Sequence, residues 1–149
     1  PELADLAADI ARDVPDGGSL DALRRLDRIV QGIFARGDSI LIFPEGGLGT
    51  QEGRLRLPLK RGAIIYAMRA GVPIVPVGIT GNRDLFLGKE ITIRFGKPLD
   101  LGHVERPRPR AVQAGQDALE AALRDLLDPN YQEPRGPKPL RHLLNHMLW

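Results

Sequence analysis

The sequence predicts an α/β fold in which crossover helices cover the faces of a mostly parallel sheet and a long C-terminal helix packs on that sheet. Two apolar runs, residues 39–43 and 74–80, have the continuous hydrophobicity of strands that are covered on both faces. Between them, residues 61–70 place apolar side chains on one side of a helix, and Gly71 ends it. Strand, helix and strand in this order predict a parallel pair with a right-handed crossover.

The remaining helices are predicted from their apolar spacing. Residues 2–12 form a short amphipathic helix, and Ser19 caps a second helix that ends before Gly37. Residues 111–127 form the long C-terminal helix, and a last amphipathic segment covers residues 140–149.

Two other segments follow from composition. Residues 44–58 have no period and hold several glycines, so they form a loop at the end of the first strand. Residues 90–95 alternate apolar with polar side chains, which predicts a strand that is half exposed or at an edge.

Length and composition limit the class of protein. With 149 residues, 42% of them hydrophobic and 27% charged, the chain suits one soluble globular domain. It has no cysteine, which excludes disulfides and thiolate metal sites. No apolar run approaches the roughly 18 residues that span a bilayer, and no signal peptide opens the chain. We therefore expect a cytoplasmic protein, peripheral at the inner face of the membrane.

Charge is unevenly distributed along the chain. Residues 1–50 hold 5 Lys and Arg against 9 Asp and Glu, whereas residues 51–149 hold 16 against 10. Cationic clusters attract phosphate groups on soluble ligands, anionic lipids or nucleic acid, and a solvated surface is the open alternative. Aromatic residues make up only 5% of the chain, so base stacking and a nucleic-acid partner are not expected.

The most informative motif is Phe-Pro-Glu-Gly at residues 43–46, directly behind the first apolar run. It places the Glu45 carboxylate where a strand ends and a glycine-rich loop begins, at the sheet edge where ligands usually bind. A second block, Val-Pro-Ile-Val-Pro at residues 72–76, follows the predicted crossover helix. The order of these blocks resembles the glycerolipid acyltransferase family, over roughly residues 19–101.

The resemblance implies an enzyme of phospholipid biosynthesis. It would transfer a fatty acyl group from a carrier thioester, acyl-CoA or acyl-carrier protein, to a lysophospholipid such as 1-acylglycerol-3-phosphate. In that family a histidine, followed after four residues by aspartate, lies upstream of the Phe-Pro-Glu-Gly block. No such pair precedes Phe43, and the three histidines all lie downstream. We therefore expect the catalytic motif upstream of this chain, no turnover by the chain alone, and no cofactor or metal.

The resemblance assigns substrate binding to Glu45 and Gly46. The matching glutamate helps to shape the acceptor site, and the glycine permits close approach of the backbone. A carboxylate at the end of a buried strand also needs hydrogen bonds or cations that offset its desolvation. The alternative is that Glu45 only anchors the loop by accepting backbone N–H groups.

Arg54 is the predicted phosphate contact. The family block usually continues Thr-Arg-Ser, whereas residues 47–50 read Gly-Leu-Gly-Thr, so another cation must replace the usual arginine. Arg54 is the nearest one after the loop glycines, and a guanidinium binds phosphate in bidentate fashion. Arg56, Lys60 and Arg61 are further candidates, and an ordinary exposed arginine is the alternative reading of Arg54.

Two residues match the family more loosely. Arg12 falls where the family has an arginine that contacts the acceptor phosphate, although an arginine at a helix end explains it equally well. Pro76 belongs to the block that lines the acyl-chain side or supports the loop. As a proline within a strand, Pro76 also marks a kink or an edge.

The last segment carries a separate hypothesis. Its leucines lie beside Arg141, His142 and His146, so it either lies in a lipid interface or docks on the domain. The two histidines have a spacing that can bind metal, but no carboxylate completes a site and we expect packing. We divide the chain into a partial acyltransferase domain, residues 1–130, and a C-terminal linker with an amphipathic segment, residues 131–149.

Two other classes of protein stay open. One is a non-catalytic lipid- or phosphate-binding module that is acyltransferase-like. The other is an α/β phosphate-binding domain in which the Phe-Pro-Glu-Gly match is coincidental. Dinucleotide and P-loop binding are not expected, because the loop glycines do not have the required spacing.

Overall fold

The computed structural model describes residues 20–47, 49 and 51–148. The chain divides into two compact units, Pro1–Leu41 and Ile42–Trp149. The predicted helix over residues 2–12, and with it Arg12, lies outside the described residues. The predicted division after residue 130 stays a prediction.

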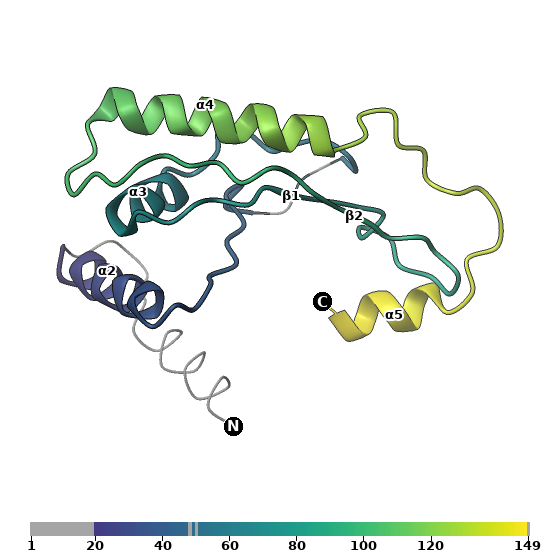
Figure 1. Cartoon of the computed structure of the whole chain (residues 1–149). Helices are drawn as coiled ribbons and strands as arrows, with labels where there is room; N and C mark the ends of the chain where they lie inside the picture. The colour runs from purple at the N-terminus through teal and green to yellow at the C-terminus, as the bar shows by residue number, and fades with distance from the viewer. Residues whose placement is uncertain (1–19, 48, 50, 149) are drawn as a thin grey trace. The chain divides into compact units, whose positions relative to one another are not determined.

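Helix α2, Leu20–Ala35, is the regular element described in the first unit (Figure 1). Its apolar residues recur at helical spacing, and Val30 is buried. Gly37 follows with a φ of 79°, and its N–H donates to the Phe34 carbonyl at 3.0 Å. Glycine adopts this left-handed conformation without a Cβ penalty, so the predicted helix and its stop signal are confirmed.

The predicted parallel sheet is wrong. Residues 39–43, expected as its first strand, form no ladder in the described part of the chain, and the Leu41 and Phe43 residues are 77% and 68% exposed. The boundary between the two units falls inside this run, after Leu41. An apolar run shows that a segment can be buried. The partner strand that would bury it is a tertiary feature, and local periodicity does not encode it.

The sheet that forms is a two-stranded antiparallel pair in the second unit. Strand β1, Val77–Thr80, pairs with β2, Thr92–Phe95, and an isolated antiparallel bridge joins Ile74 to Leu99. The strand predicted from residue 74 is thus shorter than expected, and its partner is a hairpin neighbour. The strand predicted over residues 90–95 forms over Thr92–Phe95 at the edge of the pair, and its apolar residues Ile93 and Phe95 are 54% and 72% exposed.

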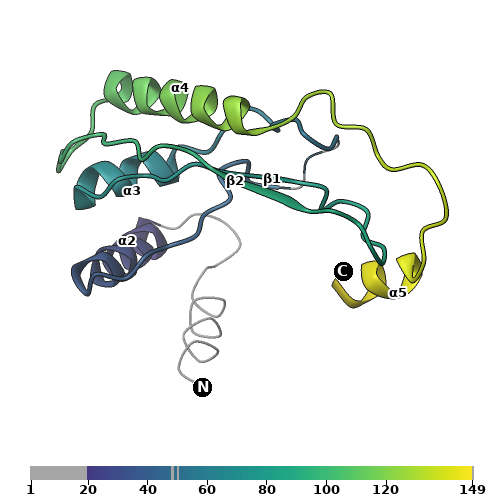
Figure 2. The same ribbon diagram turned by 45° about the vertical axis from the view of Figure 1, so that its right-hand side comes forward.

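Two helices pack together in the same unit. Helix α3, Gly62–Ala70, and helix α4, Pro109–Leu126, contact each other, and α4 also contacts β1. Figures 1 and 2 show α4 along one side of the β1–β2 pair. Both helices were predicted, and Gly71 caps α3 with a φ of 64°. The core between them consists of Leu59, Ile64, Met68, Val112, Leu119 and Leu123.

Helix α5, Arg141–Leu148, lies beside the turn that joins β1 to β2, which we call the hairpin turn (residues 81–91; Figure 2). The chain reaches α5 through residues 127–140, which contain neither helix nor strand. The Leu87 N–H donates to the Pro139 carbonyl at 2.9 Å. The C-terminal segment, residues 131–148, therefore returns to the hairpin turn.

Candidate functional site

The loop after the Phe-Pro-Glu-Gly motif, residues 44–60, folds back on itself. The Arg56 backbone N–H donates to Glu45 Oε2 at 2.6 Å, and the Lys60 N–H donates to the Pro44 carbonyl at 2.6 Å. These bonds bring the two ends of the loop together. Glu45 thus makes the contact expected of a loop anchor, and its role in substrate binding stays a prediction.

Two glycines let cationic side chains cross this loop. Gly46 has a φ of 64°, and a Cβ there would sit 2.6 Å from Lys60 Cε. A Cβ on Gly47 would collide with the Arg56 guanidinium. The Lys60 stem and the Arg56 guanidinium therefore lie over the backbone that directly follows Glu45. Positive charge is thus held close to the motif.

An open groove of about 1000 Å³ lies in the second unit. The loop contributes Arg54, the hairpin turn contributes Arg83, and α5 contributes Arg141. The other lining residues are Gln51, Glu52, Asp84, Pro129, Tyr131, Glu133, His142, Asn145 and His146. Segments that are far apart in sequence therefore build one polar groove with three arginines.

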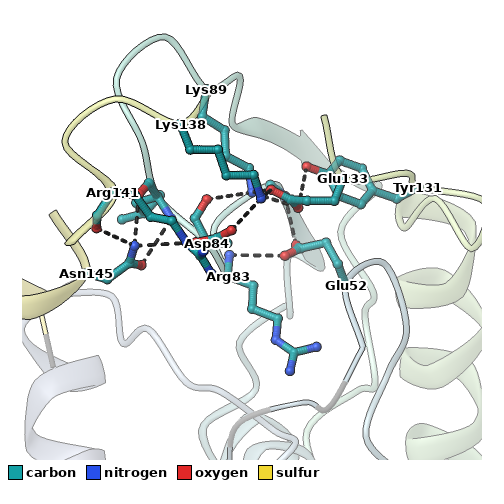
Figure 3. Close-up of polar contacts among 11 residues, drawn as sticks. Glu52, Arg83, Asp84, Lys89, Tyr131, Glu133, Lys138, Arg141 and Asn145 are labelled. Atoms are coloured by element: carbon teal, nitrogen blue, oxygen red, sulfur yellow. Dashed lines mark hydrogen bonds and ion pairs between the residues drawn. The ribbon is translucent and has the colours of Figure 1, made fainter. Parts of the chain in front are cut away.

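Glu52 joins the loop to the hairpin turn. Its Oε1 accepts the Gly81 N–H at 2.8 Å and its Oε2 accepts the Arg83 N–H at 3.1 Å (Figure 3). The next residue, Gly53, is buried with a φ of 72°, and a Cβ there would collide with the Asp128 carbonyl. Since hydrogen bonds to a carboxylate are charge-assisted, Glu52 holds the backbone of the groove wall in place.

Asp84 joins the hairpin turn to the C-terminal segment. Its Oδ2 lies 2.6 Å from Lys138 Nζ and its Oδ1 lies 2.7 Å from Arg141 Nε (Figure 3). The hydrogen bond from Lys138 lowers the pKa of Asp84, burial opposes this, and Arg141 lowers it further. The same bond raises the pKa of Lys138. Both partners are therefore held in their charged forms.

A second ion pair stands next to the first. Lys89 Nζ lies 2.7 Å from Glu133 Oε1, and only 1% of the Lys89 side chain is exposed. The ammonium also donates to the Asp84 carbonyl oxygen at 2.8 Å and lies 5.5 Å from the Phe86 ring centroid. Burial raises the pKa of Glu133, but the hydrogen bonds and charges of Lys89 and Lys138 together outweigh it and the pKa is lowered. Burial also raises the pKa of Tyr131.

The acidic groups of the groove are thus paired within the protein. Glu52 binds backbone amides, whereas Asp84 and Glu133 bind cations of the hairpin turn and the C-terminal segment. In the part of the chain that the structure describes, Arg54 has no hydrogen-bond or ion-pair partner. Its guanidinium is therefore available to an anionic ligand that enters the groove.

The other predicted site residues lie elsewhere. Pro76 is fully buried, its carbonyl accepts the Gly96 N–H at 2.9 Å, and it does not line the groove. A ligand contact by Pro76 stays a prediction, and Arg12 falls outside the described residues. Gly46 lies in the loop, under the stem of Lys60.

Most residues of the groove were not predicted from the sequence, among them Glu52, Arg83 and Asp84. Arg83 and Asp84 follow the end of β1 after Gly81 and Asn82, and charged residues just past an apolar run were a signal that was available. Glu52 carried no such signal, because its partners are backbone amides 29 and 31 residues away.

The two histidines of α5 lie on the groove wall. Their rings pack edge to face with centroids 6.0 Å apart. Within residues 20–47, 49 and 51–148, no cluster of three or more His, Cys, Asp or Glu could hold a metal ion. This T-shaped arrangement is one that packed aromatic rings adopt.

Residues 12–80 match the family described as Acyltransferase. The predicted resemblance to the glycerolipid acyltransferases is confirmed. The matched segment includes Glu45, Gly46 and Arg54. It ends with β1, so the hairpin turn and the C-terminal segment lie outside it. In the described residues, no helix has the length and apolar character needed to cross a bilayer.

Curated relatives match the chain in part. Tafazzin of Drosophila melanogaster is 32% identical over 108 residues, which cover 62% of this chain and 29% of tafazzin. The 1-acyl-sn-glycerol-3-phosphate acyltransferase alpha of Homo sapiens is 34% identical over 77 residues, which cover 52% of this chain and 26% of the human protein. The 1-acyl-sn-glycerol-3-phosphate acyltransferase of Bacillus subtilis is 28% identical over 100 residues, which cover 63% of this chain and 47% of the Bacillus protein. The chain thus spans less than half of each relative. No solved structure gives a significant match.

Proposed function

We propose that this chain provides the acceptor-binding part of a glycerolipid O-acyltransferase. The reaction transfers a fatty acyl group from a carrier thioester, acyl-CoA or acyl-carrier protein, to the hydroxyl of a lysophospholipid such as 1-acylglycerol-3-phosphate. The observation that carries the proposal is the family match over residues 12–80, which includes Glu45 and Arg54. The human and Bacillus relatives are both 1-acyl-sn-glycerol-3-phosphate acyltransferases by name, which supports this acceptor.

In this proposal Arg54 binds the phosphate of the acceptor. Its guanidinium lines the groove without a protein partner in the described chain, and it can pair with two phosphate oxygens at once. Arg83 and Arg141 line the same groove, where Arg141 is ion-paired with Asp84. Glu45 acts by holding the loop that carries Arg54, since it accepts the Arg56 N–H.

The chemical step needs groups beyond those of the groove. A base must remove the proton of the acceptor hydroxyl, whose oxygen then attacks the thioester carbon. Hydrogen-bond donors stabilise the resulting oxyanion before the C–S bond breaks and the thiol leaves with the proton. The family uses a histidine and an aspartate for this base. This chain has no such pair before Phe43, so we place the pair upstream in the full protein.

The proposed substrates set the location of the protein. A lysophospholipid acceptor is an amphiphile that partitions into membranes, so the enzyme must reach a bilayer surface. We propose that the protein is peripheral at the inner face of the membrane, where acyl thioesters are available. The acceptor, the acyl thioester and the lipid surface are then its partners.

Phosphate binding tests the acceptor site in the 149-residue chain itself. Glycerol 3-phosphate and inorganic phosphate serve as probes, and binding is followed by NMR of the arginine side chains. Arg54→Ala should weaken binding about tenfold, because charge-assisted hydrogen bonds are lost. Arg106→Ala is the matched control, since Arg106 is exposed and does not line the groove. Equal dissociation constants for Arg54→Ala and the wild type would remove Arg54 from the site.

Activity is tested in the full protein. Arg54→Ala there should raise KM for lysophosphatidate about tenfold with a smaller change in kcat, because the phosphate is remote from the reacting hydroxyl. The 149 residues alone should show no turnover, and acyl transfer by them would refute an upstream base. Phosphate binding by a full protein without any turnover would instead support the non-catalytic module.

A further inference from the structure

One carboxylate, that of Glu52, connects the backbone segments that carry two arginines of the groove. Its Oε1 accepts the Gly81 N–H at 2.8 Å, and its Oε2 accepts the N–H of Arg83 itself at 3.1 Å (Figure 3). In its own segment, Glu52 stands two residues before Arg54. Both arginines are exposed and line the groove. A single side chain therefore ties the position of one arginine to that of the other.

The backbone is fixed on each side of Arg54. Gly53, directly before it, is buried with a φ of 72°, and a Cβ there would collide with the Asp128 carbonyl. Two residues after Arg54, the Arg56 N–H donates to Glu45 Oε2 at 2.6 Å. Among the residues that the structure describes, the Arg54 guanidinium has no hydrogen-bond or ion-pair partner. A guanidinium on a fixed backbone suits a ligand contact, because little of the chain must be ordered on binding.

The backbone that carries Arg83 is restricted as well. Gly81 has a φ of 94°, and a Cβ there would collide with the Glu90 carbonyl. Figure 3 shows the Arg83 side chain extending away from the ion pairs around Asp84, whereas Arg141 is engaged in one of those pairs. A guanidinium has five N–H donors, so an arginine can keep a contact within the protein and still bind phosphate oxygens.

We propose that Arg54 and Arg83 bind the same phosphate group and that Glu52 is the positioning residue that keeps the two arginines at a fixed spacing. The proposal rests on the acceptor site described above and adds a second arginine to it. Arg83 lies beyond the matched residues 12–80, so the family match does not assign it. Two guanidinium groups can contact all three terminal oxygens of a phosphate monoester, whereas a diester has two free oxygens and less charge. The groove should therefore prefer an acceptor that ends in a phosphate monoester.

Glu52→Gln separates positioning from simple charge repulsion. The substitution removes a negative charge from the groove, but it leaves only one oxygen to accept the two backbone N–H groups. If Glu52 positions the arginines, Glu52→Gln weakens binding of glycerol 3-phosphate about threefold, because one of these hydrogen bonds is lost. Tighter binding by Glu52→Gln would show that the carboxylate only repels phosphate, and it would overturn the proposal. Glu120→Gln is the matched control, since Glu120 is a partly buried carboxylate of α4 that pairs with Arg124 and does not line the groove.

Arg83→Ala tests the shared phosphate contact. Binding of glycerol 3-phosphate, a monoester, and of glycerophosphoglycerol, a diester, is followed by NMR titration of the 149-residue chain. Arg83→Ala should weaken monoester binding about tenfold and diester binding by less, so that the preference for the monoester falls. Arg106→Ala, outside the groove, should change neither. Equal binding of both probes by the wild type, or a preference that Arg83→Ala leaves unchanged, would overturn the proposal.

A double-mutant cycle tests whether Glu52 acts through Arg83. In the Glu52→Gln background, Arg83→Ala should weaken binding by a smaller factor than in the wild type, because Arg83 is no longer held in place. Equal factors in both backgrounds would contradict the positioning role. Arg83→Ala leaves Glu52 intact, so its monoester preference decides the proposal even where Glu52→Gln is unstable. A wild type that binds no phosphate would overturn the acceptor site itself, whereas binding that needs Arg54 but neither Arg83 nor Glu52 would overturn this inference alone.

Discussion

Asp84 and Lys138 are 54 residues apart in sequence, yet the carboxylate oxygen and the ammonium nitrogen lie 2.6 Å from each other. The pair fastens the C-terminal segment to the hairpin turn. Both segments line the groove, and α5 begins three residues after Lys138. The shape of the candidate site and the position of α5 therefore depend on the same ion pair.

This pair predicts a loss of stability in acid. Pairing lowers the pKa of Asp84 from 3.8 and raises that of Lys138 from 10.5. The stabilisation from Asp84 is thus complete above its unfolded pKa and is lost as pH falls through the folded value. The stabilisation from Lys138 is complete below its unfolded pKa and is lost as pH rises through its folded pKa. The contribution of the pair is therefore constant between about pH 5 and 9.

Urea unfolding of the wild type and Asp84→Asn measures this effect. From pH 5 to pH 3 the unfolding free energy of the wild type should fall more steeply than that of Asp84→Asn. The variant has no carboxylate to protonate at this position. Asp117→Asn is the control, since Asp117 is exposed and hydrogen-bonds only to Gln113 of its own helix among the described contacts. Parallel pH profiles for the wild type and Asp84→Asn would contradict the prediction.

Glu45 should matter for stability through one hydrogen bond. Glu45→Ala removes the acceptor of the Arg56 N–H and should lower the unfolding free energy by about 1 kcal/mol. Glu45→Gln keeps an oxygen acceptor, so it should lower the unfolding free energy by less than Glu45→Ala does. Chemical denaturation of the three proteins tests the expected order of stability, in which the wild type is the most stable, Glu45→Gln is next and Glu45→Ala is the least stable. An alanine variant as stable as the wild type would show that the bond does not anchor the loop.

Local signals in the sequence predicted the helices but not the sheet. The apolar stripe of α2, the glycine that ends it and the cap of α3 at Gly71 are all encoded within a few residues. Strand pairing is not local. Residues 39–43 and 74–80 both carry the pattern of buried strands, but only Val77–Thr80 finds a ladder, and its partner is the half-exposed β2.

The same distinction applies to the site. Glu45 and Arg54 were found because they stand next to a motif with recognisable order along the chain. The groove that Arg54 lines also depends on Glu52, which bonds to amides of the hairpin turn, and on Asp84, which bonds to the C-terminal segment. Contacts between segments tens of residues apart leave no pattern in a single sequence.

Gly53 should be intolerant of any side chain. Its φ is 72°, and a Cβ would run into the Asp128 carbonyl, a backbone atom that cannot rotate away. Gly53→Ala should cost at least about 2 kcal/mol of stability, from backbone strain and overpacking together. Gly88 is the control, because its φ is 85° and nothing lies within 4 Å of the position of a Cβ.

Thermal and urea unfolding of the two glycine variants separate the causes. Gly88→Ala carries the conformational strain alone and should cost about 1 kcal/mol. The difference between the two variants is the steric contact of the loop with the end of α4. Equal destabilisation by both substitutions would mean that this contact relaxes without cost.

Asn145 should control the docking of α5 more than the stability of the core. Its amide makes both hydrogen bonds to the Leu85 backbone, and none of the core residues belongs to α5. In Asn145→Ala the Leu85 N–H loses its acceptor, so its hydrogen exchange should accelerate at least about tenfold. The amides of α4 should keep their protection. Asn130→Ala is the control, because the Asn130 side chain is exposed and makes none of these contacts.

Docking of α5 also shapes the groove. Release of the helix would move Arg141 away from the groove, so Asn145→Ala should weaken binding of inorganic phosphate, by a smaller factor than Arg54→Ala. Accelerated exchange at Leu85 with unchanged phosphate binding would show that the groove does not need the docked helix.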